Sequence, residues 1–170
     1  QHGGVPILWK TGHSLIKAKM KEEGAILAGE MSGHMFLADD WYGFDDGLYA
    51  SGRLAMLIAQ QPRPFSALVD ELPKYESTPE IRLDCADAAK FDVVAQVTAH
   101  FRRTHEVVDV DGARILFGDG WGLVRASNTQ PVLVVRFEAR TPERLAAIQA
   151  EVMGVLAGFP AVNIHGGTGH

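Results

Sequence analysis

The chain has a single cysteine, Cys85, and no hydrophobic run close to the roughly 20 residues that a membrane-spanning helix requires. One thiol excludes an intrachain disulfide and any metal site built from several cysteines. Such low cysteine content fits a protein of the reducing cytoplasm. No segment has the composition of a signal peptide. We therefore predict a cytoplasmic protein without membrane contact.

Several common site patterns are missing as well. The seven histidines lack the spacing of zinc ligands, and no glycine-rich phosphate loop of the Walker type is present. Asp45-Asp46-Gly47 lacks the ligand spacing of a calcium loop, so we predict no metal site in this chain. Ser14 and Ser32 lie near histidines, but no oxyanion-hole pattern accompanies them, which argues against a catalytic triad. The formal charge of -5 argues against a nucleic-acid partner.

The domain organisation follows from length and from the distribution of proline. A chain of 170 residues has room for one domain or two small ones, and four prolines fall within residues 62–79. We predict a first part over residues 1–73, a linker or hinge over 74–79, a second part over 80–160 and a flexible glycine-rich tail over 161–170. The chain begins without methionine, and we interpret it as a piece of a longer protein.

The first part alternates predicted strands and helices, which is typical of an α/β arrangement. A helix with Leu15, Ile16 and Met20 on its apolar side is expected to stop at Gly24. A second helix, capped by Asp45 or Asp46, is expected to run to about Gln60 with its own apolar face. Short apolar runs predict three strands, at residues 5–9, 25–28 and 35–37.

The second part is predicted to be an α+β domain in the order strand, helix, three strands, helix. The first strand is Ile81–Cys85, and a helix with apolar residues at helical spacing covers about residues 88–103. Asp111-Gly112 supplies the turn of a hairpin between residues 106–110 and 113–117. Val132–Phe137 forms the last strand. A helix then starts at Thr141-Pro142-Glu143, which has a capping hydroxyl, a proline at the first position and an acid in the first turn.

The segment Gly29–His34 concentrates polar chemistry after an apolar run. Glu30, Ser32 and His34 alternate, so on an extended segment they would face one side. A carboxylate can accept bonds from two sugar hydroxyls, a serine can donate or accept, and a protonated imidazole can bind an anion. The alternative is a polar turn with a structural histidine.

A second polar cluster, 125–129, follows Gly122–Val124 and precedes the last strand. Arg125 can direct two N–H groups at phosphate oxygens, and turn amides can complete an anion nest. Ser127 and Thr129 add hydroxyls, and Asn128 adds an amide. These residues predict a phosphate-binding loop. An ordinary strand connection with polar turn residues is the alternative.

A third, weaker candidate is the turn that follows Trp9. Lys10 and His13 lie where a predicted strand passes into a helix, and ligands of α/β sheets gather at strand ends. Lys10 is a candidate contact to phosphate or hydroxyl groups. His13 can instead cap the helix.

Three segments, Trp9–Ser14, Gly29–His34 and Gly122–Thr129, occur in an order that resembles the α-D-phosphohexomutases. The resemblance is greatest to their bacterial phosphomannomutase/phosphoglucomutase branch and extends over residues 1–160. It implies an enzyme of four domains that interconverts hexose 1-phosphates and hexose 6-phosphates. This chain would be the latter part of the third domain and the whole fourth domain. The fourth domain would have the fold of the TATA-box-binding protein, β-α-β-β-β-α, which gives no reason to expect DNA binding.

The resemblance also implies roles for the polar segments. The Gly29–His34 segment would select glucose or mannose phosphates by their O3 and O4 hydroxyls, through Glu30 and Ser32 with His34 close by. The 125–129 segment would hold the phosphate that is not being transferred, and Lys10 and His13 would line the same cleft. The fourth domain would close by a hinge near residues 73–78.

Two motifs of the family are missing. The phosphoserine motif Thr-Ala-Ser-His-Asn-Pro and the magnesium loop Asp-Gly-Asp-Gly-Asp-Arg do not occur in this chain. Phosphoryl transfer requires a placed phosphate donor and a cation that balances developing charge. The chain is therefore expected to be inactive alone, with Mg²⁺ bound by missing N-terminal domains of the longer enzyme. A non-catalytic sugar-phosphate-binding module and an α/β domain without a site remain as alternatives.

Overall fold

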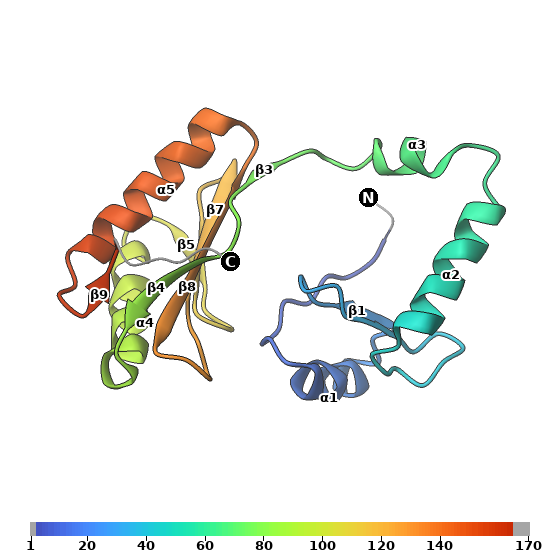
Figure 1. Ribbon diagram of the computed structural model, residues 1–170, viewed down its shortest axis with the longest axis horizontal. Coiled ribbons are helices and arrows are strands. Elements are labelled where there is room, and N and C mark those ends of the chain that lie inside the picture. Colours follow the sequence, from blue (N-terminus) through green and yellow to red (C-terminus); the bar gives the residue numbers. More distant parts are fainter. Residues whose placement is uncertain (1–2, 165–170) are drawn as a thin grey trace. The chain divides into compact units, whose positions relative to one another are not determined.

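A computed structural model describes residues 3–164, and the chain divides into two compact units, Gln1–Pro73 and Lys74–His170 (Figure 1). Most of the predicted tail, residues 165–170, lies outside the described residues.

Unit 1 is built from two short strands and three helices. Its strands β1 (Leu27–Gly29) and β2 (Met35–Leu37) form an antiparallel hairpin. Helix α1 (His13–Glu23) precedes the hairpin, and helices α2 (Gly47–Ala59) and α3 (Phe65–Val69) follow it. The buried cluster of this unit is small and consists of Ile16, Met20 and Phe36. Unit 1 alone therefore buries little apolar surface.

The predicted ends of the helices in unit 1 are confirmed. Gly24 follows α1 in the left-handed conformation, with φ 65°, and its backbone N–H donates to the carbonyl of Met20. Asp46 caps α2, because its side chain accepts a hydrogen bond from the backbone N–H of Tyr49 at 2.9 Å. Local capping signals were sufficient to place both ends.

The strand predicted at residues 5–9 does not form. Val5, Ile7, Leu8 and Trp9 are exposed in an irregular segment, because no described strand lies beside them to accept and donate ladder hydrogen bonds. The expected apolar face of α2 is exposed as well, with Leu57 at 46%. The prediction that these residues are buried is therefore wrong for this chain, because none of the described residues covers them.

Unit 2 is an antiparallel sheet of seven strands with two long helices. Its elements are β3 (Glu76–Ser77), β4 (Ile81–Cys85), α4 (Asp87–Phe101), β5 (Glu106–Val108), β6 (Ala113–Leu116), β7 (Gly120–Ala126), β8 (Val132–Ala139), α5 (Pro142–Ala157) and β9 (Val162–Asn163). The strand order is β5-β6-β7-β8-β4-β9, and β3 pairs with β8. The predicted α+β architecture is confirmed.

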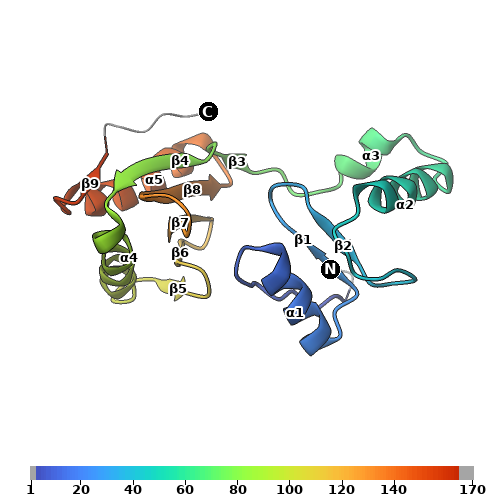
Figure 2. The ribbon, with the colours of Figure 1, turned by 60° about the horizontal axis from the view of Figure 1, so that its bottom comes forward.

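Both long helices cover the same face of this sheet (Figure 2). Val97 and Phe101 from α4 and Val152 and Leu156 from α5 join the inward residues of the strands in one buried cluster. Alternate strand residues point to the opposite face, which no helix in the described part of unit 2 covers. The polar side chains of β7 and β8 therefore lie on a helix-free face.

The sheet has one more strand between the helices than the predicted three. Residues 120–126, expected to lead into a loop, form β7 and pair along their full length with β8. Arg125 therefore lies within a strand, opposite Val134, instead of in a turn. The pairing satisfies backbone groups that a loop would leave to water.

The predicted linker and tail also contribute edge strands. Within the linker 74–79, Glu76–Ser77 pairs with β8, and the N–H of Thr78 donates to the carbonyl of Phe137 at 3.0 Å. Within the tail predicted from residue 161, Val162–Asn163 pairs with β4. Both segments extend the sheet by main-chain hydrogen bonds.

Candidate functional site

The Gly29–His34 segment is the turn of the β1–β2 hairpin, not an extended segment. The N–H of Glu30 donates to the carbonyl of His34 at 2.9 Å, and the N–H of Gly33 donates to the carbonyl of Glu30 at 3.0 Å. The three polar side chains of this segment are therefore gathered on a tight loop and not aligned along a strand. Ser32 and His34 are exposed, and Glu30 is half-buried.

Glu30 connects the hairpin to the turn that carries Lys10 and His13. Its Oε1 accepts a hydrogen bond from the backbone N–H of Gly12 at 2.8 Å, at the start of α1. The positive end of the helix dipole favours a carboxylate at this position. Two of the predicted segments thus come together, with Lys10 and His13 both exposed beside the contact.

His34 is held by a residue that the sequence did not indicate. Its Nδ1 lies 2.6 Å from Oδ2 of Asp45, a residue of the loop before α2. Phe36 forms an isolated bridge with the same residue, so the loop lies against β2. The imidazole is therefore oriented by a carboxylate, an arrangement common for functional histidines.

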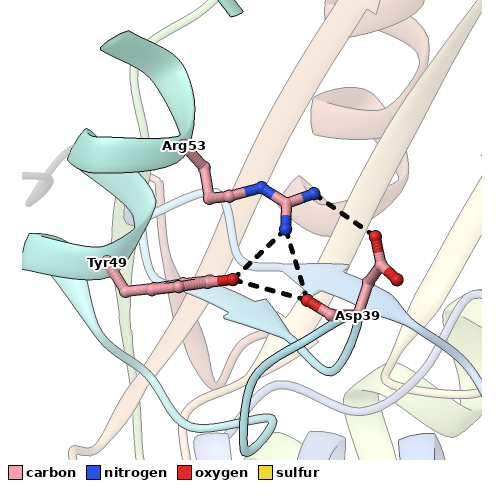
Figure 3. Close-up of polar contacts among 3 residues, drawn as sticks. All are labelled: Asp39, Tyr49 and Arg53. Atoms are coloured by element: carbon pink, nitrogen blue, oxygen red, sulfur yellow. Dashed lines mark hydrogen bonds and ion pairs between the residues drawn. The ribbon is translucent and has the colours of Figure 1, made fainter. Parts of the chain in front are cut away.

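The loop that contains Asp45, between β2 and α2, is held against α2 by hydrogen bonds. Figure 3 shows the guanidinium of Arg53 between the Tyr49 hydroxyl, 3.2 Å away, and the Asp39 carboxylate, 3.3 Å away. The Arg53 guanidinium also donates to the Asp39 carbonyl at 3.3 Å. The Tyr49 hydroxyl and then Asp39 raise the pKa of Arg53 above its ordinary value. Trp41 stacks on Tyr49 with ring centroids 4.3 Å apart, which fixes the same loop.

In unit 2, Ser127 shapes the loop between β7 and β8. It is 8% exposed, and its Oγ accepts hydrogen bonds from the N–H groups of Thr129 at 3.3 Å and Gln130 at 3.2 Å. A hydroxyl oxygen has two acceptor positions, so its O–H hydrogen is the group that remains to donate. Asn128 and Thr129 are exposed at the tip of the loop.

Arg125 lies one residue before the loop, on the helix-free face. Its neighbours Val124 and Ala126 point into the core, so the alternation of the strand directs Arg125 away from the helices. Its Nε is 4.0 Å from Oδ2 of Asp111, with the two side chains 20% and 25% exposed. This separation is longer than a hydrogen bond, and a guanidinium can direct two N–H groups at an oxyanion.

The same face carries further positive charge. Arg114 and Arg136 flank Leu123 in register, and their Nε atoms are buried without a hydrogen-bond partner among the described residues. Arg114 also lies over the ring of Trp121, 4.4 Å from the centroid. A local basic face thus exists on a chain whose net charge is negative.

Two residues that sequence reasoning missed support the loop through Gln130. The Lys90 ammonium donates to the backbone carbonyl of Gln130 at 3.0 Å, and Arg82 donates to the Gln130 side chain at 2.8 Å. No sequence pattern marks them, because a lysine three residues after Asp87 on a helix normally indicates a solvated ion pair.

No cluster of three His, Cys, Asp or Glu residues that could hold a metal ion occurs among residues 3–164. Within the same described range, no helix has the length and apolarity required to cross a membrane.

Comparison with known proteins identifies relatives of both units. Residues 1–75 match the family model described as phosphoglucomutase/phosphomannomutase, alpha/beta/alpha domain III, and residues 80–155 match the model of the C-terminal domain of the same family. A phosphomannomutase/phosphoglucomutase of Pseudomonas syringae pv. tomato is 48% identical over 150 residues, which cover 88% of this chain and 32% of that protein. A phosphoglucomutase of Neisseria gonorrhoeae is 44% identical over 163 residues, which cover 94% of this chain and 35% of that protein.

A solved structure shares the fold. A phosphoglucomutase/phosphomannomutase family protein from Burkholderia thailandensis superimposes with a TM-score of 0.84 at 48% identity, over 95% of this chain and 34% of that one. The chain therefore spans about a third of the length of the relatives it matches.

Proposed function

The chain belongs to the phosphoglucomutase/phosphomannomutase family, and we propose that it is the sugar-phosphate-binding part of an enzyme that interconverts hexose 1-phosphates and hexose 6-phosphates. The observation that carries this proposal is the arrangement at the end of β7. The guanidinium of Arg125, whose Nε lies 4.0 Å from Oδ2 of Asp111, stands next to a tight polar loop on a basic face.

The phosphate of the substrate would bind at Arg125 and the loop that follows it. The guanidinium would donate two parallel N–H groups to phosphate oxygens. The Ser127 O–H, with the exposed side chains of Asn128 and Thr129, would bind the remaining oxygens. Because Ser127 Oγ already braces two backbone amides, this loop would be formed before the ligand arrives.

The sugar would bind at the hairpin turn of unit 1. The Glu30 carboxylate, positioned by the Gly12 N–H, would accept bonds from two neighbouring hydroxyl groups. Ser32 would add a hydroxyl contact, and His34, oriented by Asp45, would lie close to the ring. Lys10 and His13 would line the same cleft at the start of α1.

In the longer enzyme, a phosphoserine would transfer its phosphoryl group to the sugar and give a hexose bisphosphate. That intermediate would turn around, so the hairpin and the Arg125 loop would each meet the substrate in two orientations. Mg²⁺ would be bound by other domains of that enzyme, because residues 3–164 of this chain contain no cluster of three His, Cys, Asp or Glu residues that could hold a metal ion. The residues of this chain would bind and orient the substrate, and the chain alone would not transfer phosphate.

Calorimetric titration of the 170-residue chain with glucose 1-phosphate tests the phosphate role of Arg125. We expect Arg125→Ala to weaken binding by about tenfold or more, because a charge-assisted bidentate contact is lost. Arg102→Ala is the matched control, because it removes an arginine of unit 2 that lies in the α4–β5 connection and pairs with Asp109, just after β5. Equal affinity of the Arg125→Ala variant and the unmodified chain would contradict the assignment.

A further inference from the structure

Lys90 is an unusual residue for a helix that packs on a sheet. It is 4% exposed, yet it carries a charge, and it lies among the residues of α4 that face the core. A buried ammonium loses its hydration, and a protein with an apolar residue of similar volume at such a position is often at least as stable. Packing alone therefore does not explain this residue.

The partners of Lys90 indicate what it does. Its Nζ lies 2.6 Å from Oδ1 of Asp87, whose side chain is 71% exposed, and 3.0 Å from the carbonyl oxygen of Gln130. The second contact joins residues that are 40 positions apart in the sequence. The ammonium therefore fixes the backbone of the β7–β8 loop from the inner side.

Gln130 is also held from a second direction. Its Oε1 accepts a hydrogen bond from Arg82 of β4 at 2.8 Å, and Arg82 is itself oriented by Glu80 at 2.9 Å. Its backbone N–H donates to Ser127 Oγ at 3.2 Å. Two cations from two different elements and one hydroxyl of the loop thus meet at a single residue.

We propose that Lys90 and Arg82 are positioning residues that hold Gln130, and with it the Ser127–Thr129 turn, in the form that receives a phosphate monoester dianion. This inference rests on the proposed function of the loop. Nearby carboxylates balance part of the positive charge: Asp87 faces Lys90, Glu80 faces Arg82 and Asp111 faces Arg125. Of these cations, Lys90 is the one shielded from water, so its field at the loop is weakened least by solvent.

The test compares Lys90→Met with Lys74→Met in the 170-residue chain. Both variants remove one lysine of unit 2. Lys74 precedes β3, which pairs with Glu138 and Ala139 at the end of β8 remote from the loop. Methionine has a similar length to lysine but no charge. Because the Asp87 side chain is exposed, water can solvate its carboxylate when the Lys90 ammonium is removed.

Two readouts are needed, hydrogen exchange of the Thr129 and Gln130 amides and the affinity for glucose 1-phosphate. We expect Lys90→Met to accelerate exchange at both amides and to weaken binding by about tenfold, the size associated with one charge-assisted hydrogen bond. The thermal midpoint should change little, and Lys74→Met should change neither readout.

Each alternative outcome overturns the inference in a recognisable way. Unchanged exchange at Thr129 and Gln130 means that Lys90 does not hold the loop. Faster exchange with unchanged affinity means that holding the loop does not serve phosphate binding. Faster exchange and weaker binding together with a fall in the thermal midpoint of the Lys90→Met variant assign Lys90 a structural role. If the unmodified chain binds no glucose 1-phosphate, the proposed function fails, and the exchange rates alone then decide whether Lys90 holds the loop.

Discussion

The turn between β5 and β6 closes against the strand that carries Arg125, and Gly112 is the residue that permits this contact. Its φ is 91°, and a Cβ atom built there would lie 2.5 Å from the carbonyl oxygen of Val124 and 2.9 Å from Cα of Arg125. Both atoms belong to the backbone, so no side chain can rotate to make room. The substitution Gly112→Ala must therefore displace the turn or the strand.

Two contributions set the size of the effect. Placing an L-residue at positive φ costs roughly 1–2 kcal/mol. Forcing an extra carbon into packed structure adds about 1–3 kcal/mol. Gly118 provides a matched control, because its φ is 81° and a Cβ there would meet nothing within 4 Å. We expect Gly112→Ala to lower the free energy of unfolding of unit 2 by about 1–3 kcal/mol more than Gly118→Ala does.

Urea unfolding followed through amide signals of buried strand residues, such as Val124 and Val135, measures this difference within unit 2. Tryptophan fluorescence is less suitable, because Trp9 and Trp41 report on unit 1 and Trp121 on unit 2. Equal losses in the two variants would show that the turn has room for a side chain. A larger loss in Gly118→Ala would refute the steric argument altogether.

Two further predictions concern ionisable groups of unit 2. Arg144 donates to both carboxylate oxygens of Asp119, at 2.6 and 3.1 Å, and lowers the pKa of Asp119 below its ordinary 3.8. The ion pair therefore stabilises the fold above pH 3.8, and this stabilisation is lost as the pH falls through the lower pKa that Asp119 has in the folded state. The difference in thermal midpoint between the unmodified chain and Asp119→Asn should therefore disappear between about pH 5 and pH 2. A difference that stays constant with pH would contradict the pairing. Burial raises the pKa of the Cys85 thiol, and the residue is 2% exposed. Iodoacetamide at pH 8 should label Cys85 at least about a hundredfold more slowly in the folded chain than in urea, and similar rates would contradict its burial.

Local signals in the sequence predicted much of unit 2. Asp111-Gly112 forms the expected turn, and the Thr141 side chain caps α5 by accepting a hydrogen bond from the N–H of Arg144 at 3.3 Å. Strand β7 was missed because Gly120 and Gly122 give its first residues the appearance of a loop. Its pairing with β6 and β8 is decided by residues distant in the sequence, which local patterns do not contain.

The candidate sites show the same limit. The alternation of Glu30, Ser32 and His34 suggested a strand, but the structure has a hairpin turn there. The partner of His34, Asp45, could not be inferred, because the pairing depends on how the loop before α2 folds back. The burial of Lys90 likewise depends on a loop 40 residues away.

In unit 1, the hydrophobic pattern did not predict which apolar residues are covered. The apolar residues at 5–9 and along α2 were predicted to be buried, yet they are exposed in this chain. Burial requires a surface that covers them, and the relatives are about three times as long.

The most direct test of the central claim is an NMR titration of the ¹⁵N-labelled chain with glucose 1-phosphate, with glucose as the uncharged control. The phosphate assignment predicts saturable shifts of the amides of Arg125 and Ser127–Thr129 that glucose does not produce. Additional shifts at Glu30–His34 would show that the sugar-binding turn is formed in this chain as well. The absence of any saturable shift at Arg125–Thr129 would contradict the assignment of this loop to phosphate.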